Sequence, residues 1–326
     1  MRLRIPADES SMRLAVGAAR GGRIGRRRRP GLLGLSPLAW QDALTGYAFL
    51  MPAVLGLLVF SLVPLVYAAV MSLNRWDAFR GPLGFVGLEN YQTLATDPSF
   101  WRGLRNTAYY ALWEVPLQCG LALGLALLIQ RPLRGIGLFR AAYYLPVVIS
   151  MVVASALWRI LLDSQSGLLN SVLAAVGLPR QPFLLSTTLT LPTLAVALSW
   201  KWVGFSMLVF LAGLQGIPQD YYEAAQIDGA SALQRFWSIT LPLLRRPAAV
   251  VLVTTSVNAF KLFTPIYVIT QGGPQESTTT IVYQVFQNAF RYNKLDLASA
   301  MGFVLLLILL GLTAIQLRWL RSSVEY

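Results

Sequence analysis

Residues 221–244 read YYEAAQIDGASALQRFWSITLPLL, a charged, amphipathic stretch with one glycine. It lies between two apolar runs of the length that crosses a membrane, since about 20 residues at 1.5 Å each span the roughly 30 Å of hydrocarbon in a bilayer. A polar stretch between two such runs must emerge from the lipid. The two flanking runs therefore predict a membrane protein, and the polar stretch between them is a loop whose function has to be explained.

The composition of the 326 residues is typical of a membrane protein. Hydrophobic residues make up 56 %, charged residues 13 %, and the mean hydropathy is +0.57, unlike a soluble chain. Apolar runs of spanning length recur along the sequence. We expect an all-α integral membrane protein, a bundle of six transmembrane helices. The predicted spans are 46–72, 104–130, 141–162, 186–213, 247–270 and 296–317.

Basic residues favour one orientation of these spans. With the N-terminus inside, the inner segments hold 17 arginines and the outer loops and helix ends hold eight basic residues, while Lys201 and Lys261 fall within spans. Because inner loops carry the excess of positive charge, both termini are predicted to be cytoplasmic. Residues 1–42 are arginine-rich and predicted to be disordered, whereas 43–326 form the transmembrane domain. An arginine run beside a first span usually fixes topology and contacts anionic lipid, so we expect membrane lipid and no nucleic acid as its partner.

Several classes of site are excluded by residue counts. The chain has no histidine and one cysteine, Cys119, which removes His-based triads, His-ligated metals and internal disulfides. A phosphate-binding loop needs Gly-Lys-Ser/Thr, and none of the three lysines follows a glycine. We therefore expect no catalytic residues, no metal and no cofactor, with ATP, if it is used, bound by another chain.

The loop 216–246 is predicted to fold into two short helices joined at Gly229. Asp220 or Gln219 is a candidate N-cap, and Gly229 permits a left-handed turn. The second helix is expected to present one apolar face, formed by Leu233, Phe236, Trp237 and Leu241. Two interpretations remain open at this point: a docking surface for a soluble partner, and an interfacial helix that only anchors the bundle.

The spacing within this loop resembles a known family. Glu223-Ala224-Ala225, then Gly229, and later Leu241-Pro242, match the EAA loop of membrane subunits of binding-protein-dependent ABC importers. The stretches GLENYQTLATDPSFWRGLRNTAYY, YYLPVVISMVVASALWRILLD, WKWVGFSMLVFLAGLQGIP and NAFKLFTPIYVITQGGP resemble the carbohydrate-uptake branch of that family. Together they extend over most of the chain from about residue 46.

The resemblance implies the fold and the partners. The fold would be a type I ABC importer permease core (MetI-like) in the bacterial cytoplasmic membrane. The partners would be an ABC ATPase dimer, a second permease subunit in a heterodimer, and an extracytoplasmic solute-binding protein. The residues implied to contact the ATPase are Glu223, Ala224, Ala225, Asp228 and Gly229, with Glu223 offering its charge to an arginine.

Polar residues within two spans suggest a solute pathway, because such groups are costly in lipid unless they face a cavity or a partner. In the fifth span Thr254, Asn258 and Lys261 share one helical face. The candidate set is Trp202, Gly204, Thr254, Thr255, Asn258 and Lys261. Aromatic faces with amide and hydroxyl groups suit a sugar. The alternative is that these groups form hydrogen bonds between helices, each of which stabilises the bundle by about 0.6 kcal/mol.

The two intramembrane lysines leave the solute open. A lysine at mid-depth costs roughly 2.5 to 3.5 kcal/mol, which favours a nearby anion, water or carbonyl. Glu114 is one candidate partner; a transported anion such as glycerol 3-phosphate, carried by the same branch, is another. A secondary transporter or channel is the alternative class, but it needs intramembrane carboxylates for coupling, and Glu114 is the only clear one. A membrane enzyme would need clustered nucleophiles, bases or metal ligands.

Overall fold

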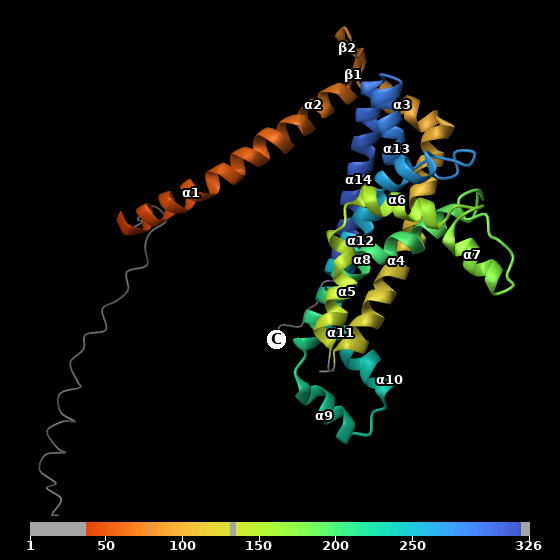
Figure 1. Ribbon diagram of the computed structural model, residues 1–326. Coiled ribbons are helices and arrows are strands. Elements are labelled where there is room, and N and C mark those ends of the chain that lie inside the picture. Colours follow the sequence, from red (N-terminus) through yellow and green to blue (C-terminus); the bar gives the residue numbers. More distant parts are fainter. Residues whose placement is uncertain (1–36, 78, 131–134, 321–326) are drawn as a thin grey trace, which may run out of the picture. The chain divides into compact units, whose positions relative to one another are not determined.

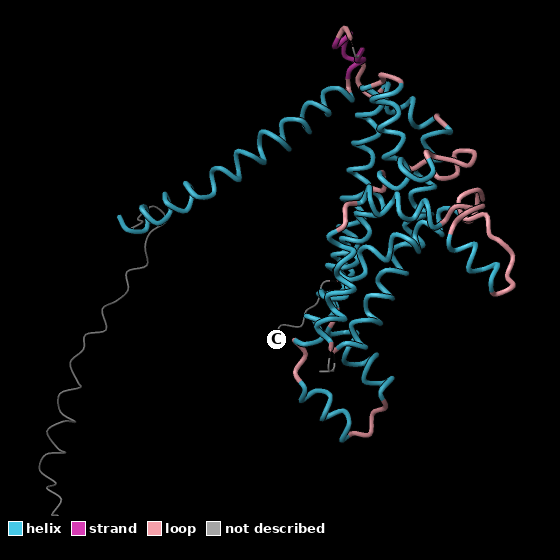
Figure 2. The backbone as a smooth tube through the Cα atoms, viewed as in Figure 1, coloured by secondary structure: helices cyan, strands magenta, loops and turns pink. Residues whose placement is uncertain are grey.

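The structure is a computed structural model, and it describes residues 37–77, 79–130 and 135–320 (Figures 1 and 2). Most of the predicted N-terminal tail, residues 1–36, lies outside the described residues. Residues 37–42 belong to a helix, so the prediction of disorder is wrong for these six residues. The chain divides into two units, residues 1–63 and 64–326, and each is described by itself.

The first unit contains the start of the first predicted span. Helix α1 runs Pro37–Leu57 and is followed by a π-helical segment, Leu58–Leu62. Helix α2, Val63–Ser72, continues the same helical run. The apolar part of this run, Ala43–Ser72, is long enough to cross a bilayer, which agrees with the predicted span 46–72.

The second unit is almost entirely helical. A two-stranded antiparallel hairpin, β1 and β2, comes first, with a register irregularity at Arg75/Trp76. Short π-helical segments interrupt or extend three of the later helices, at Phe236–Thr240, Ile266–Thr270 and Gln287–Arg291. The elements are β1 Asn74–Asp77, β2 Gly81–Phe85, α3 Glu89–Thr96, α4 Pro98–Ile129, α5 Ile136–Val148, α6 Met151–Leu161, α7 Leu168–Ala175, α8 Thr190–Gln215, α9 Gln219–Ile227, α10 Ala232–Arg235, α11 Leu241–Leu243, α12 Arg245–Phe260, α13 Ile281–Phe286 and α14 Leu295–Trp319.

Three predicted spans of the second unit are single long helices. Helices α4, α8 and α14 correspond to the predicted spans 104–130, 186–213 and 296–317, and each is long and apolar enough to cross a membrane. Helix α8 is the central one: 67 % of its most apolar window is buried within the chain, against 28 % for α4 and 22 % for α14. Its most extensive partner is α4.

The other two predicted spans of the second unit are not single long helices. The predicted span 141–162 is the pair α5 and α6, bent by 99°. The predicted span 247–270 ends as a helix at Phe260, and α12 is bent by 69° against the helical run that precedes it. The described residues therefore hold four single spans, or six spans if each bent pair counts as one.

The buried core follows α8 along its length. One cluster joins α4, α8 and α12 and includes Tyr110, Leu194 and Leu198. A second cluster lies further toward the C-terminal end of α8 and includes Met207 and Leu244. A third joins α13 and α14 to the start of α4. The core thus holds α8 on several sides, and α9 and α10 lie at the end of the bundle opposite to α3 and the hairpin (Figure 1).

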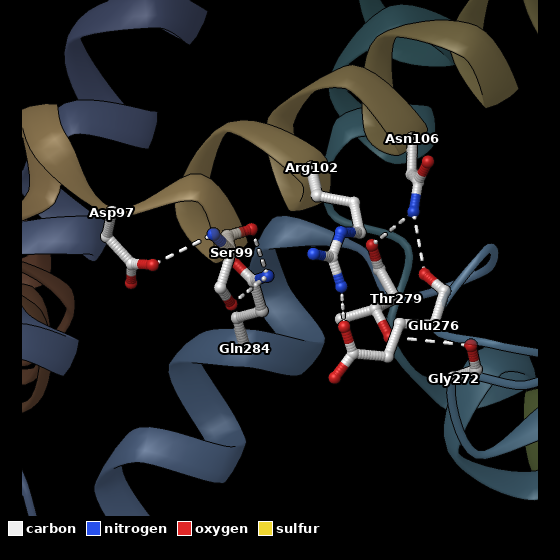
Figure 3. A network of polar contacts seen from close by, with 8 residues as sticks. All are labelled: Asp97, Ser99, Arg102, Asn106, Gly272, Glu276, Thr279 and Gln284. Atoms are coloured by element: carbon white, nitrogen blue, oxygen red, sulfur yellow. Dashed lines mark hydrogen bonds and ion pairs between the residues drawn. The ribbon is translucent and has the colours of Figure 1, made fainter.

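The first turns of α4 hold the segment that follows α12. Asn106 Nδ2 donates to the carbonyls of Glu276 and Thr279, both at 3.0 Å. Arg102 forms an ion pair with the Glu276 carboxylate. Gln284 Nε2 donates to the Ser99 carbonyl at 2.6 Å (Figure 3). Thr280 caps α13 by accepting from Tyr283 N.

Candidate functional site

A cavity of about 260 Å³ lies where α4, α8 and the end of α12 meet. Helix α4 supplies Tyr110, Glu114 and Gln118 at intervals of four residues, so all three share one helical face. Helix α8 supplies Leu198 and Trp202, and Met151 comes from the first turn of α6. The end of α12 and the chain after it supply Thr255, Asn258 and residues 259 and 261–265. The lining therefore mixes aromatic, amide, hydroxyl and charged groups.

The acidic and amide groups of α4 are buried in this lining. Glu114 is 4 % exposed, and its Oε2 accepts from Tyr110 Oη at 3.1 Å and from Ser199 Oγ at 3.4 Å. Gln118 is also 4 % exposed, and its Nε2 donates to Ser206 Oγ at 3.1 Å. Its Oε1 is buried without a hydrogen-bond partner among the described residues. A buried acceptor without a donor is costly.

Four of the six predicted pathway residues line the cavity: Trp202, Thr255, Asn258 and Lys261. Lys261 lies just beyond the end of α12, where its backbone N–H donates to the Val257 carbonyl at 3.1 Å. Of the three residues predicted to share a face of the fifth span, Asn258 and Lys261 line the cavity and Thr254 does not.

Two predicted pathway residues do not line the cavity. Gly204 is a helix-packing residue: a Cβ there would lie 2.1 Å from the carbonyl oxygen of Tyr143 in α5. Thr254 is exposed, and its hydroxyl donates to the Val250 carbonyl at 2.7 Å, within its own helix. Their role in a solute pathway stays a prediction, and the structure places both outside the lining of this cavity. The sequence places a polar or small residue in a span, but the helix packing decides which face it occupies.

Of the partners considered for Lys201, the structure shows carbonyl oxygens and not Glu114. It is 3 % exposed, and its Nζ donates to the carbonyls of Pro146, Val147 and Ile149, which end α5. Glu114 is hydrogen-bonded to hydroxyl groups instead. The prediction that Lys201 requires a compensating group is confirmed, and carbonyl oxygens supply the compensation.

The predicted ATPase-contact residues share one exposed helix and its turn. Helix α9 contains no buried residue, and Glu223, Ala224, Asp228 and Gly229 are exposed while Ala225 is half-buried. Gly229 has a φ of 77°, its N–H donates to the Gln226 carbonyl, and the Ala230 N–H donates to the Ala225 carbonyl. This pair of hydrogen bonds is the Schellman ending of a helix, which requires a left-handed residue at the glycine position. The predicted turn at Gly229 is confirmed.

Two details of the loop differ from expectation. The N-cap position of α9 is Pro218, without a side-chain hydrogen bond, so neither Asp220 nor Gln219 caps the helix. After Gly229 the chain restarts with a capping box, in which Ser231 accepts from Gln234 N and Gln234 Oε1 accepts from Ser231 N. The run then becomes π-helical over Phe236–Thr240. The extra residue in a π turn shifts the faces, so the apolar face predicted with an α-helical period does not hold from Phe236 onward.

A second hollow of about 750 Å³ separates the loop from the ends of α4 and α8. Its lining includes Gln130, Gln215, Tyr222 and Arg235. Across it, Tyr222 Oη and Thr240 Oγ1 are 3.0 Å apart and hydrogen-bonded. The two halves of the loop are therefore tied together, and the motif side of α9 remains exposed.

The main residues missed by sequence reasoning are Tyr110 and Gln118. Tyr110, Glu114 and Gln118 recur every four residues, and a polar stripe at helical spacing within an apolar span was the available signal. Met151 and Phe263 carried no such signal, because both resemble ordinary core residues in sequence. They line the cavity only because α6 and the chain after α12 begin and end beside it.

Comparison with known proteins places the chain among transport proteins. The "Probable ABC transporter permease protein YesP" of Bacillus subtilis is 37 % identical over 291 residues, covering 88 % of this chain and 93 % of the relative. The "Arabinooligosaccharides transport system permease protein AraP" of the same organism is 33 % identical, covering 87 % and 91 %. The "sn-glycerol-3-phosphate transport system permease protein UgpA" of Agrobacterium fabrum is 33 % identical, covering 90 % and 100 %.

A solved structure and a family model agree with these relatives. A chain in the crystal structure of a bacterial alginate ABC transporter, in complex with an alginate pentasaccharide-bound periplasmic protein, has a TM-score of 0.74 and 25 % identity, covering 87 % of this chain and 99 % of that chain. The family model "Binding-protein-dependent transport system inner membrane component" matches residues 118–325. These residues include the loop 216–246 and most of the bundle. The chain belongs to this family of membrane components of binding-protein-dependent transport systems.

Proposed function

We propose that the chain is the pore-forming permease of an ATP-driven importer for a sugar or oligosaccharide, acting without catalysis of its own. The observation that carries the proposal is the cavity between α4, α8 and α12. It combines the ring of Trp202 with amide groups of Gln118 and Asn258, and Gln118 Oε1 is a buried acceptor without a hydrogen-bond partner among the described residues. A sugar ring stacks on an aromatic face while its hydroxyls donate and accept hydrogen bonds. The names of AraP and of the alginate transporter support the same solute class.

A doubly charged phosphate ester is less well supported as the solute. That alternative used two lysines, but an ammonium group has three donors, and those of Lys201 are directed at three carbonyls. Among the lining residues Lys261 is the one basic group, so the pair of ammonium groups that this alternative needs does not face the cavity. One ammonium beside amide, hydroxyl and aromatic groups favours a sugar over glycerol 3-phosphate, although UgpA relatives carry the latter in their name.

The solute test compares two glutamines that each donate to a serine hydroxyl, of which only Gln118 lines the cavity. Gln118→Leu removes an amide of the cavity lining, and Gln316→Leu removes a half-buried glutamine that donates to Ser256 Oγ at 2.8 Å. The assay is uptake by proteoliposomes holding the complete importer, with a panel of neutral sugars and oligosaccharides and glycerol 3-phosphate. Gln118→Leu should raise KM at least about ten-fold, since a site built for hydrogen bonds discriminates strongly. Gln316→Leu should leave KM unchanged. Equal effects of the two, or uptake of glycerol 3-phosphate alone, would contradict the proposal.

We propose further that the exposed side of α9 docks onto a separate ATPase on the cytoplasmic side, with both termini on that side. Glu223, Ala224 and Gly229 present one charge and small surfaces, which suit insertion into a cleft. Tyr221 and Ile227 on the same helix are 50 % and 86 % exposed, as expected of apolar contacts that a partner covers. A second permease subunit, forming a heterodimer with this chain, and a solute-binding protein outside complete the proposed assembly, and the lipid bilayer surrounds it.

The docking test reverses one charge. Glu223→Arg should lower solute-stimulated ATP hydrolysis at least about ten-fold, because like charges placed against each other at an interface cost several kcal/mol. Glu89→Arg makes the same charge change at the N-terminal end of α3, at the opposite end of the bundle, and should leave hydrolysis unchanged. If Glu223→Arg couples normally, α9 is an anchor of the bundle and the ATPase docks elsewhere.

A further inference from the structure

A side chain from another helix reaches the break between α5 and α6. The two helices meet at 99°, and the last turn of α5 ends with carbonyls that no further helical turn can satisfy. Pro146 O accepts from Ile149 N at 3.2 Å. Within a membrane, such carbonyls need partners supplied by the protein. Lys201 of α8 supplies them, donating to Pro146 O at 3.2 Å, Val147 O at 3.0 Å, and Ile149 O.

Charge and geometry both suit a lysine at this position. The C-terminal end of a helix carries partial negative charge, so a cation there is favoured. The ammonium has three donors for three carbonyls, and its Nζ also lies 5.0 Å from the centre of the Trp202 ring. Lys201 is 3 % exposed and lies outside the cavity lining. It is therefore engaged with backbone rather than available to a solute.

One turn further along α8, a glycine brings the same two helices together. A Cβ on Gly204 would lie 2.1 Å from Tyr143 O and 3.0 Å from Tyr144 Cα, so α5 contacts the α8 backbone there directly. Gly204 and Lys201 are three residues apart and lie on the same side of α8. The close contact and the charged contact together fix where α5 ends.

The place where α5 ends determines one wall of the cavity. Two residues after Ile149, Met151 begins α6, and Ser150 caps this helix by accepting from Val153 N. Met151 is a lining residue of the cavity. A side chain that holds Ile149 therefore holds the start of α6, and with it the Met151 wall.

We propose that Lys201 is a positioning residue of the transport pathway, which sets the Met151 wall of the cavity by holding the end of α5. The proposal rests on the proposed function only in treating this cavity as the solute path. Trp202, the next residue on α8, lines the cavity directly. In this proposal the adjacent residues have different roles: Lys201 positions the wall of the cavity, and Trp202 contacts the solute.

The experiment measures the position of the Met151 wall and the binding of solute in separate assays. Cys119, the single cysteine, is replaced by serine, and Met151→Cys is introduced into the complete importer in proteoliposomes. The rate at which a small charged thiol reagent labels Cys at position 151 reports the wall. Solute KM and the maximal uptake rate report the pathway. Position 201 is varied to Arg, Gln and Met, and Lys294→Met, outside the cavity lining and exposed at the start of α14, is the matched control.

The expected result is a graded series. Arg, which keeps the charge and several donors, should stay within about three-fold of the lysine in labelling rate and KM, Gln should be intermediate, and Met should change both at least about ten-fold, since small misplacements cost up to 10²-fold. Lys294→Met should match the parent. Should Lys201→Met fail to assemble, the order Lys, Arg, Gln still tests the proposal.

Other outcomes overturn one claim or the other. Unchanged labelling and KM in both Gln and Met variants would overturn the positioning role. A loss of affinity confined to anionic solutes, with normal labelling, would make Lys201 a ligand and overturn the proposal as well. Graded labelling without protection of position 151 by any sugar would support the positioning role and instead overturn the assignment of the cavity to solute.

Discussion

The loop 216–246 and helix α8 are both assigned to solute import, but they differ in how much of each is buried within the chain. In α9 no residue is buried within the chain, whereas 67 % of the most apolar window of α8 is buried. The loop takes its shape from hydrogen bonds between residues a few positions apart, at Gly229 and at Ser231. Helix α8 takes its place from contacts with α4 and α5. Substitutions in the loop should therefore change coupling, and substitutions in α8 should change the bundle.

The largest effect is expected at Gly204. Gly204→Leu forces a side chain into the space occupied by the α5 backbone, and overpacking of this kind should cost about 3 kcal/mol or more. The midpoint of thermal unfolding in detergent, measured by loss of monodisperse protein, reports the change. Gly124→Leu on α4, where a Cβ has nothing within 4 Å, should leave that midpoint nearly unchanged. Equal shifts for the two variants would show that the α5–α8 contact does not limit stability.

An intermediate effect is expected at Asn106, which is 7 % exposed and donates to two carbonyls of the segment after α12. Asn106→Leu leaves both carbonyls without that donor and should destabilise the protein by about 1 to 3 kcal/mol. The same thermal assay measures it. Asn288→Leu removes an amide that donates only within its own helical run and to a methionine sulfur, and a smaller shift is expected there. A shift for Asn106→Leu no larger than this control would contradict the importance of the network in Figure 3.

A local effect without loss of the bundle is expected at Gly229. Its φ of 77° costs a residue with a side chain roughly 1 to 2 kcal/mol, although a Cβ added at this position would have nothing within 4 Å. Gly229→Val should therefore lower coupled ATP hydrolysis while the unfolding midpoint stays as in the parent. Gly229→Asn, which tolerates the left-handed region, should retain most of the coupling. A drop in the unfolding midpoint with Gly229→Val would mean that the loop stabilises the bundle.

The smallest effect is expected for the ion pair between Arg102 and Glu276. Their side chains are 38 % and 63 % exposed, and pairs exposed to this degree contribute about 0 to 1 kcal/mol. Glu276→Gln should shift the unfolding midpoint slightly, and raising the salt concentration should shrink the difference from the parent. A large shift that salt does not affect would show that the carboxylate acts by a route other than charge.

Features of the loop could be predicted because their causes are local. The glycine turn at Gly229 depends on the residues beside it, and the structure confirms it. The fold class was also predicted, and four of the six candidate pathway residues line the cavity, since polar groups in an apolar span carry their own signal. The broken third span was missed because Lys201 lies more than 50 positions from the carbonyls it contacts. No periodicity within 141–162 reveals a partner on another helix.

The roles of Gly204 and Gln118 show the same limit from two sides. Gly204 was included in the candidate pathway set, but the backbone of α5 occupies the space beside its Cα. Gln118 was overlooked although it lies one helical turn from Glu114. For both residues the type alone does not say what lies beside the side chain or the Cα. The packing of the helices decides whether that neighbour is the backbone of another helix or the cavity.

The four π-helical segments of the described residues bear on how such chains vary over evolution. Each contains five residues in a widened turn within or beside a helix. A widened turn is one residue richer than the α-helical turn that could replace it. Losing one codon within such a segment would tighten the turn and leave the helices on either side continuous. These four places are therefore where length differences among related chains can be absorbed without displacing the loop or the cavity.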